Sequence, residues 1–282
     1  MFQTRQTAPG PVRMSVKLKS DFSRWMSTQG FVAKLSVGQF AERFRDEMIP
    51  LSNTFSYFCA SVPLSEEDLK EYLEEPIAAL PTAVSAMLPR ISIILVPYLE
   101  RAEAVNGAVK AGAELVSMEK PQDDLVSWAS QVRLNNQEVL IFALKDQNVA
   151  EYHYRFYRLI ATLMADRWSD EAQTEYCTLV REELGGSVHG EVDEESWSSK
   201  QALLSQRKHV RRDSRPFREY ARHSFIDTLT LYLHGICCDI DVDTGPRQLP
   251  SRYLRKRLKL LQGLYPQPNG YAVFPEDLKE SS

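Results

Sequence analysis

Residues 217–243 read FREYARHSFIDTLTLYLHGICCDIDVD, and the prediction for the second half of the chain starts from them. If this stretch is helical to about Leu233, a step of about 100° per residue divides it into two faces. One face is apolar and contains Ala221, Phe225, Ile226, Leu229, Tyr232 and Leu233. The other face is polar and contains Glu219, His223, Asp227, Thr230 and His234. We therefore expect a helix with one side in the core and a second side that is able to carry chemistry.

The polar face suggests a metal or catalytic site. Residues four apart on a helix are neighbours, so Glu219 and Asp227 can orient the imidazole of His223 between them. Carboxylate and imidazole groups also bind divalent metals. Glu219, His223 and Asp227 are thus candidate catalytic residues, and His223 and His234 are candidate ligands of a divalent metal. The alternative is that this face is the solvent-exposed side that a surface helix requires.

A second polar group precedes this helix in the sequence. In an extended segment, His189, Glu191 and Asp193 would all point to one side. His189 and Glu191 therefore join the candidate metal ligands, provided that their segment lies against His223 or His234. The competing interpretation is an acidic cap on the next helix, which a helix N-terminus favours electrostatically.

Four cysteines limit the compartment and the kinds of site. Cys59, Cys177, Cys237 and Cys238 give neither a disulfide framework nor the spacing of a zinc knuckle. A reducing, cytoplasmic location is the prediction that follows. The adjacent Cys237 and Cys238 could be read as a nucleophile or a zinc pair, but free cysteine is commonly a small buried side chain, and that interpretation is preferred.

The fold prediction extends outward to the N-terminal half. Residues 90–97 form a β-branched run bounded by prolines, which is typical of a strand buried on both faces. Weaker strand patterns occur at 55–62, 113–119 and 138–144, and helices are predicted at 36–48, 149–168 and 171–184. We predict an α+β fold with a small mixed N-terminal sheet, helices packed on it, and a mainly helical C-terminal half.

The chain divides into four predicted regions. They are a disordered or extended tail at 1–20, an α/β-type region at 21–146, a helical region packed on it at 147–264, and a Pro-rich tail with a short strand at 265–282. The least charged segment, 76–99, contains Arg90 and is interrupted by three prolines, so no membrane span is predicted.

The charge distribution suggests a partner; the alternative is that the basic segment faces, or is balanced in solvent by, the acidic residues 36–199 of the same chain. The net charge is −4, yet residues 200–260 contain fourteen basic and six acidic side chains. The candidate contacts to a partner or to phosphate are Arg211, Arg212, Arg215, Arg255 and Lys256. A protein partner is the first expectation and nucleic acid the second, because a pI near 5.8 is unusual for a dedicated nucleic-acid-binding protein.

Three functions remain open from the sequence. The first is a non-catalytic adaptor or subunit that binds a protein partner through basic C-terminal helices. The second is a metal-dependent enzyme, possibly hydrolytic in type, that uses the face of Glu219, His223, Asp227 and His234. The third is a nucleic-acid-binding protein. Whether the chain is an enzyme stays open, although no Gly-rich nucleotide loop or serine-hydrolase motif occurs.

Overall fold

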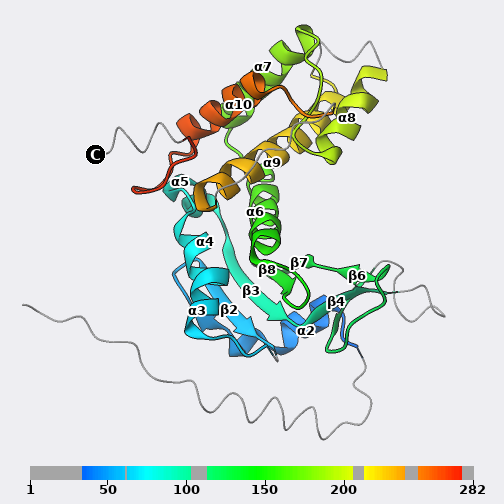
Figure 1. Ribbon diagram of the computed structural model, residues 1–282, viewed down its shortest axis with the longest axis vertical. Helices are drawn as coiled ribbons and strands as arrows, with labels where there is room; N and C mark the ends of the chain where they lie inside the picture. Colours follow the sequence, from blue (N-terminus) through cyan, green and yellow to red (C-terminus); the bar gives the residue numbers. More distant parts are fainter. Residues whose placement is uncertain (1–33, 61, 103–112, 206–212, 239–246, 275–282) are drawn as a thin grey trace, which may run out of the picture.

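The computed structural model describes residues 34–60, 62–102, 113–205, 213–238 and 247–274 (Figure 1). The tail predicted at 1–20 and the candidate contacts Arg211 and Arg212 lie outside these ranges. Within them, a mixed sheet occupies the N-terminal half and helices dominate the C-terminal half. The predicted α+β class is confirmed.

A five-stranded sheet with the order β1-β2-β3-β8-β7 forms the base of the molecule. Its three inner strands are parallel: β2 (Phe55–Cys59), β3 (Arg90–Val96) and β8 (Gln137–Ala143). The two edge strands, β1 (Ile49–Pro50) and β7 (Ala129–Leu134), pair antiparallel to their neighbours. In β3 all residues after Arg90 are buried, which explains its continuous apolar sequence.

A second, three-stranded antiparallel sheet continues from the end of β3. Its strands are β5 (Glu114–Ser117), β4 (Tyr98–Arg101) and β6 (Val126–Ser127), in that order. The short helix α2 (Val37–Arg43) begins with a capping box at Ser36 and is followed by the 3-10 turn η1 (Arg45–Glu47). Together these elements cover one face of the large sheet, where a separate cluster of buried apolar side chains forms.

The segment between β2 and β3 is helical but irregular. It contains α3 (Glu66–Leu69), the π-helical turn η2 (Lys70–Glu74), α4 (Glu75–Ala78) and α5 (Thr82–Met87). Ser65 caps its start, and three acidic residues follow in the first turn. The π turn ends at Glu74, two residues before Pro76, which has no N–H group to donate to an α-helical hydrogen bond.

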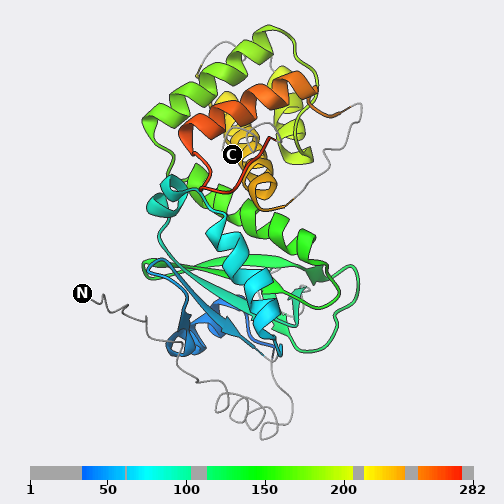
Figure 2. The same cartoon turned by 60° about the vertical axis from the view of Figure 1, so that its left-hand side comes forward.

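In the described part of the C-terminal half the structure has five helices. They are α6 (Val149–Ala165), α7 (Asp170–Gly185), α8 (Glu194–Ser205), α9 (Arg215–Cys237) and α10 (Ser251–Leu264). In Figures 1 and 2, α6 rises from the sheet and α9 packs across α6. Helices α7 and α10 lie side by side on the far side of α9. One buried apolar cluster runs from β3 and β8 through α6 and α9 to α10, so the sheet and the helices share a core.

Two features differ from the sequence-based expectations. Helix α9 continues to Cys237, and its polar side is also buried beyond residue 223, because α8 and α6 pack against it. The structure has no strand at residues 271–274; instead Phe274 is buried in the core. No helix in the described ranges is both long enough and apolar enough to span a bilayer.

Candidate functional site

The predicted polar face of α9 does not form one site. Glu219 is exposed at the start of the helix, whereas His223 is half-buried and pairs through Nδ1 with the hydroxyl of Ser199 on α8. Asp227 is 2% exposed, and Thr230 is fully buried, donating to the carbonyl of Ile226 within its own helix. These side chains contact different partners at successive turns.

Asp227 connects three helices through one ion pair and one backbone hydrogen bond. Its Oδ1 accepts from Arg158 Nη1 of α6 at 2.9 Å, and its Oδ2 accepts from the backbone N–H of Ser196 on α8 at 3.1 Å. Arg158 also pairs with Glu195 at 2.7 Å. Burial raises the pKa of Asp227 more than Ser196 and Arg158 lower it. The contacts of this carboxylate are those of a packing residue between helices.

His234 lies among aromatic rings near the other end of α9. The rings of Tyr154 and Tyr157, both on α6, have centroids 6.1 Å from that of His234. Burial is the main cause that lowers the pKa of His234 to about 4, so the imidazole is neutral at pH 7. Within the described ranges, its Nε2 is buried and has no hydrogen-bond partner.

His189 and Glu191 lie in different environments. His189 is exposed, with its ring edge-on to Trp197, whereas Glu191 is 1% exposed. Among the described residues, no group of three ligand side chains close enough to share an ion includes His189, Glu191, His223 or His234.

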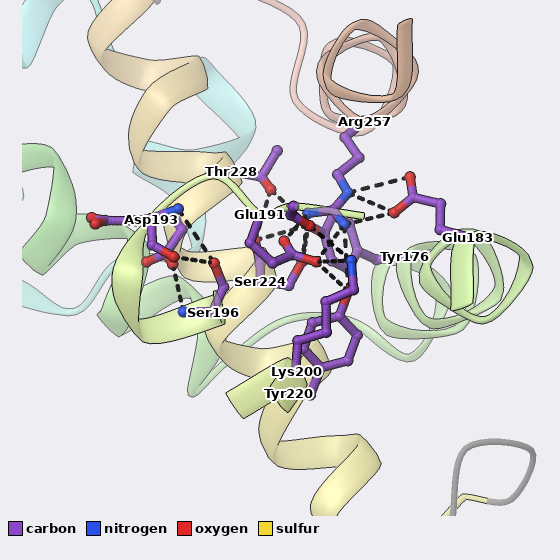
Figure 3. Close-up of polar contacts among 12 residues, drawn as sticks. Tyr176, Glu183, Glu191, Asp193, Ser196, Lys200, Tyr220, Ser224, Thr228 and Arg257 are labelled. Atoms are coloured by element: carbon purple, nitrogen blue, oxygen red, sulfur yellow. Dashed lines mark hydrogen bonds and ion pairs between the residues drawn. The ribbon is translucent and has the colours of Figure 1, made fainter. Parts of the chain in front are cut away.

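Glu191 belongs instead to a buried ionic network (Figure 3). Its Oε2 accepts from Arg257 Nη1 at 2.7 Å, and its Oε1 accepts from Lys200 Nζ at 3.0 Å and from the hydroxyl of Tyr220. Arg257 also donates through Nη2 to Glu183 Oε2 at 2.6 Å. Two cations and two carboxylates are thus enclosed together, each at most 2% exposed.

The network joins four helices. Glu183 comes from α7, Lys200 from α8, Tyr220 from α9 and Arg257 from α10. Burial by itself raises the pKa of Glu191, but the charges of Arg257 and Lys200 and their hydrogen bonds outweigh it and lower the pKa. Buried charges persist only when they are paired in this way, so the network has the character of a structural cross-link.

A different cluster contains the vicinal cysteines. His153 of α6 has its Nδ1 3.2 Å from Cys238 Sγ and its Nε2 2.9 Å from the carbonyl oxygen of Glu71 in η2. The ligand atoms of His153, Cys237 and Cys238 all lie within 4.8 Å of one another. A hydrogen bond with Cys238 is the main cause that lowers the pKa of Cys237 to about 7. We call this group the thiol–imidazole cluster.

The basic candidates that fall within the described ranges are on the surface. Arg215 is exposed at the first turn of α9. Arg255 is exposed with its guanidinium 4.6 Å from the ring centroid of Phe274, and Lys256 Nζ donates to Glu182 Oε2 at 2.8 Å. Arg257, from the same basic run, is the member that turns inward.

Sequence reasoning missed Lys200, Arg257 and His153. A signal for Arg257 does exist, since it follows Leu254 by three residues and precedes Leu261 by four, on the leucine side of α10. No local spacing relates His153 to the cysteines. Comparisons of the chain with protein-family models, curated proteins and solved structures gave no match.

Proposed function

We propose that this protein is a non-catalytic adaptor or subunit that binds an acidic surface of a partner protein through α10. The observation that carries the proposal is the row of exposed cations on this helix: Arg252, Arg255, Lys256 and Lys259. At about 100° per residue they fall within an arc of about 100°. We call them the α10 cationic face. The opposite side of α10 is anchored in the core by its leucines.

Two of these cations are held in place by aromatic rings. The guanidinium of Arg252 lies 4.7 Å from the ring centroid of Tyr253, and that of Arg255 lies 4.6 Å from that of Phe274. Stacking uses the face of a guanidinium, whereas its N–H groups donate in its plane and match the geometry of a carboxylate. Less side-chain entropy is therefore lost when a partner's carboxylates bind.

A discrete acidic protein surface fits the α10 cationic face better than nucleic acid does. Helix α7 lies beside α10 (Figures 1 and 2), and it carries the exposed acidic side chains Glu171, Glu175 and Glu182. Glu182 is in direct contact with Lys256. An extended phosphate backbone that tracked the cations would meet these carboxylates, whereas a short acidic patch need not.

The test uses the full-length chain and a fluorescent glutamate-rich peptide as the probe. We expect the triple variant Arg252→Glu, Arg255→Glu, Lys259→Glu to bind at least about tenfold more weakly, since three exposed contacts of about 0.5 kcal/mol each sum to roughly that factor. The matched control reverses three exposed cations elsewhere, Lys70, Arg101 and Lys120, which gives the same net charge.

Three outcomes of this experiment bear on the proposal. Binding that weakens in the α10 variant, persists in the control and falls with added salt supports the proposal. Equal loss in both variants would mean that only net charge matters. A single-stranded oligonucleotide that binds more tightly than the peptide and shows a steep salt dependence would refute the choice of a protein partner. Circular dichroism of each variant checks that the helices are intact.

A further inference from the structure

We propose that His153, Cys237 and Cys238 form a binding site for one thiophilic divalent cation of the Zn²⁺ type. This inference is independent of the α10 cationic face, because it concerns other residues and a different chemistry. One ligand comes from α6 and two come from the C-terminal end of α9. None of the predicted metal ligands belongs to this cluster.

The spacing of the donor atoms suits tetrahedral coordination. With Zn–S distances of about 2.3 Å and Zn–N distances of about 2.1 Å, a tetrahedral ion separates sulfur from nitrogen by about 3.6 Å and sulfur from sulfur by about 3.8 Å. His153 Nδ1 lies 3.2 Å from Cys238 Sγ, and all three donor atoms lie within 4.8 Å of one another. The required distances therefore fall inside the observed range, and small side-chain adjustments suffice.

The imidazole of His153 is oriented as in a metal site. Its Nε2 faces a carbonyl oxygen, which only accepts, so Nε2 carries the hydrogen. In the neutral ring, the lone pair of Nδ1 then points to the thiols. A backbone carbonyl that fixes the second nitrogen of a histidine is the usual outer contact of a metal ligand.

The carbonyl of Glu71 is free to do this because of the π turn. The N–H of Glu75, which would bond Glu71 in an α-helix, bonds the carbonyl of Lys70 instead. The next residue, Pro76, has no N–H to offer. The helix thus leaves one carbonyl without an internal partner, and His153 fills that role. Such π turns often occur at functional sites.

The surroundings also favour a cation. His153 is 5% exposed, whereas both cysteines are half-buried, so an ion can reach the thiols from the surface. The C-terminal end of α9 carries the negative end of the helix dipole. Binding replaces two S–H bonds by two metal–thiolate bonds and releases two protons to solvent. A fourth coordination position remains for water or another oxygen donor.

The experiment uses the tag-free, full-length chain, reduced and stripped with a chelator. Co²⁺ is the spectroscopic probe, and Zn²⁺ is then added as competitor. We expect one Co²⁺ to bind per chain, with a thiolate-to-cobalt charge-transfer band and visible absorption as intense as that of tetrahedral Co²⁺. Both absorption features should disappear when Zn²⁺ is added. Cys237→Ser and Cys238→Ser should each lower the affinity for the metal at least about 100-fold. Loss of an outer contact of a ligand can already cost that much, and each cysteine is a direct ligand in the proposed site.

Cys177→Ser on α7 is the matched control, since this buried cysteine is outside the cluster, and it should leave the affinity unchanged. His153→Gln should remove the nitrogen ligand; if that variant fails to fold, the two cysteine variants decide the matter. Absence of the charge-transfer band, unchanged affinity in Cys238→Ser, or a Cys237–Cys238 disulfide as the main form in anaerobically purified protein would overturn the proposal.

Discussion

Replacing Arg257 by Met removes the guanidinium that lies between two buried carboxylates. Arg257 is fully buried and pairs with Glu183 and Glu191. Glu191 keeps a cation, because Lys200 lies 3.0 Å from it, but Glu183 has no second ion pair within the described part of the chain. The substitution therefore strands the charge of Glu183 in a site where it is 2% exposed.

The expected loss of unfolding free energy is about 3–5 kcal/mol, the range found when one partner of a buried pair is removed. Methionine fills much of the volume of the arginine stem, so cavity formation adds little. The double variant Arg257→Met, Glu183→Gln should recover about 2 kcal/mol of that loss, because a neutral amide costs less to bury than an unpaired carboxylate.

Urea denaturation followed by far-ultraviolet circular dichroism measures these differences as shifts of the unfolding midpoint at constant slope. Glu183→Gln alone completes the cycle and isolates the coupling between the two side chains. A loss below about 1 kcal/mol for Arg257→Met, or simple additivity in the double variant, would contradict the inference that the network is a buried electrostatic cross-link.

Two further predictions concern the carboxylates. The pKa of Glu191 is lowered in the folded chain, so the ionised side chain should stabilise the fold above the ordinary glutamate pKa of about 4.3, and this stabilisation should be lost as the pH falls below that value. The urea midpoint of Glu191→Gln should therefore vary less than that of the unchanged protein between about pH 5 and 3. Equal pH dependence of the two midpoints would contradict this. The pKa of Asp227 is raised, which is the opposite direction. Asp227→Asn should therefore lower the free energy of unfolding by only about 1 kcal/mol, because Arg158 keeps its contact with Glu195 and the amide oxygen still accepts one hydrogen bond. A shift of the urea midpoint as large as that of Arg257→Met would refute this.

Local sequence patterns predict an element of this fold well where the element is buried along one whole face or on both faces. Strand β3 is recognisable because it is covered on both faces, so every residue after Arg90 is apolar or small. Helix α6 is recognisable because its buried residues recur at three and four positions. By contrast β7 alternates only weakly, although the two-residue turn at Asn135 and Asn136, with Asn135 at φ 54°, pairs it with β8 as a local hairpin.

The polar side of α9 illustrates the limit of such patterns. Asp227 and Thr230 look like solvent-facing residues in a helical wheel, yet both are buried. The partners of Asp227 come from other helices: Arg158 of α6 is 69 residues away in the sequence, and Ser196 of α8 is 31 residues away. A helical wheel gives the direction in which each side chain points, but it does not show which other element packs on that side. The same is true of His153 and Cys238, which are separated by 85 residues.

Helix α9 connects the two polar clusters and keeps them independent. The ionic network reaches α9 at Tyr220, and the thiol–imidazole cluster reaches it at Cys237, which at 1.5 Å per residue is about 25 Å further along the helix. Perturbations this far apart with no shared partner should add. Stripping metal should therefore leave the coupling between Arg257 and Glu183 unchanged, while Cys238→Ser should leave peptide binding by α10 unchanged.

Arg257 points inward and Arg255 outward on the same helix, so the buried network fixes the surface that the α10 cationic face presents, and loss of the network should weaken peptide binding even though no contact residue is altered.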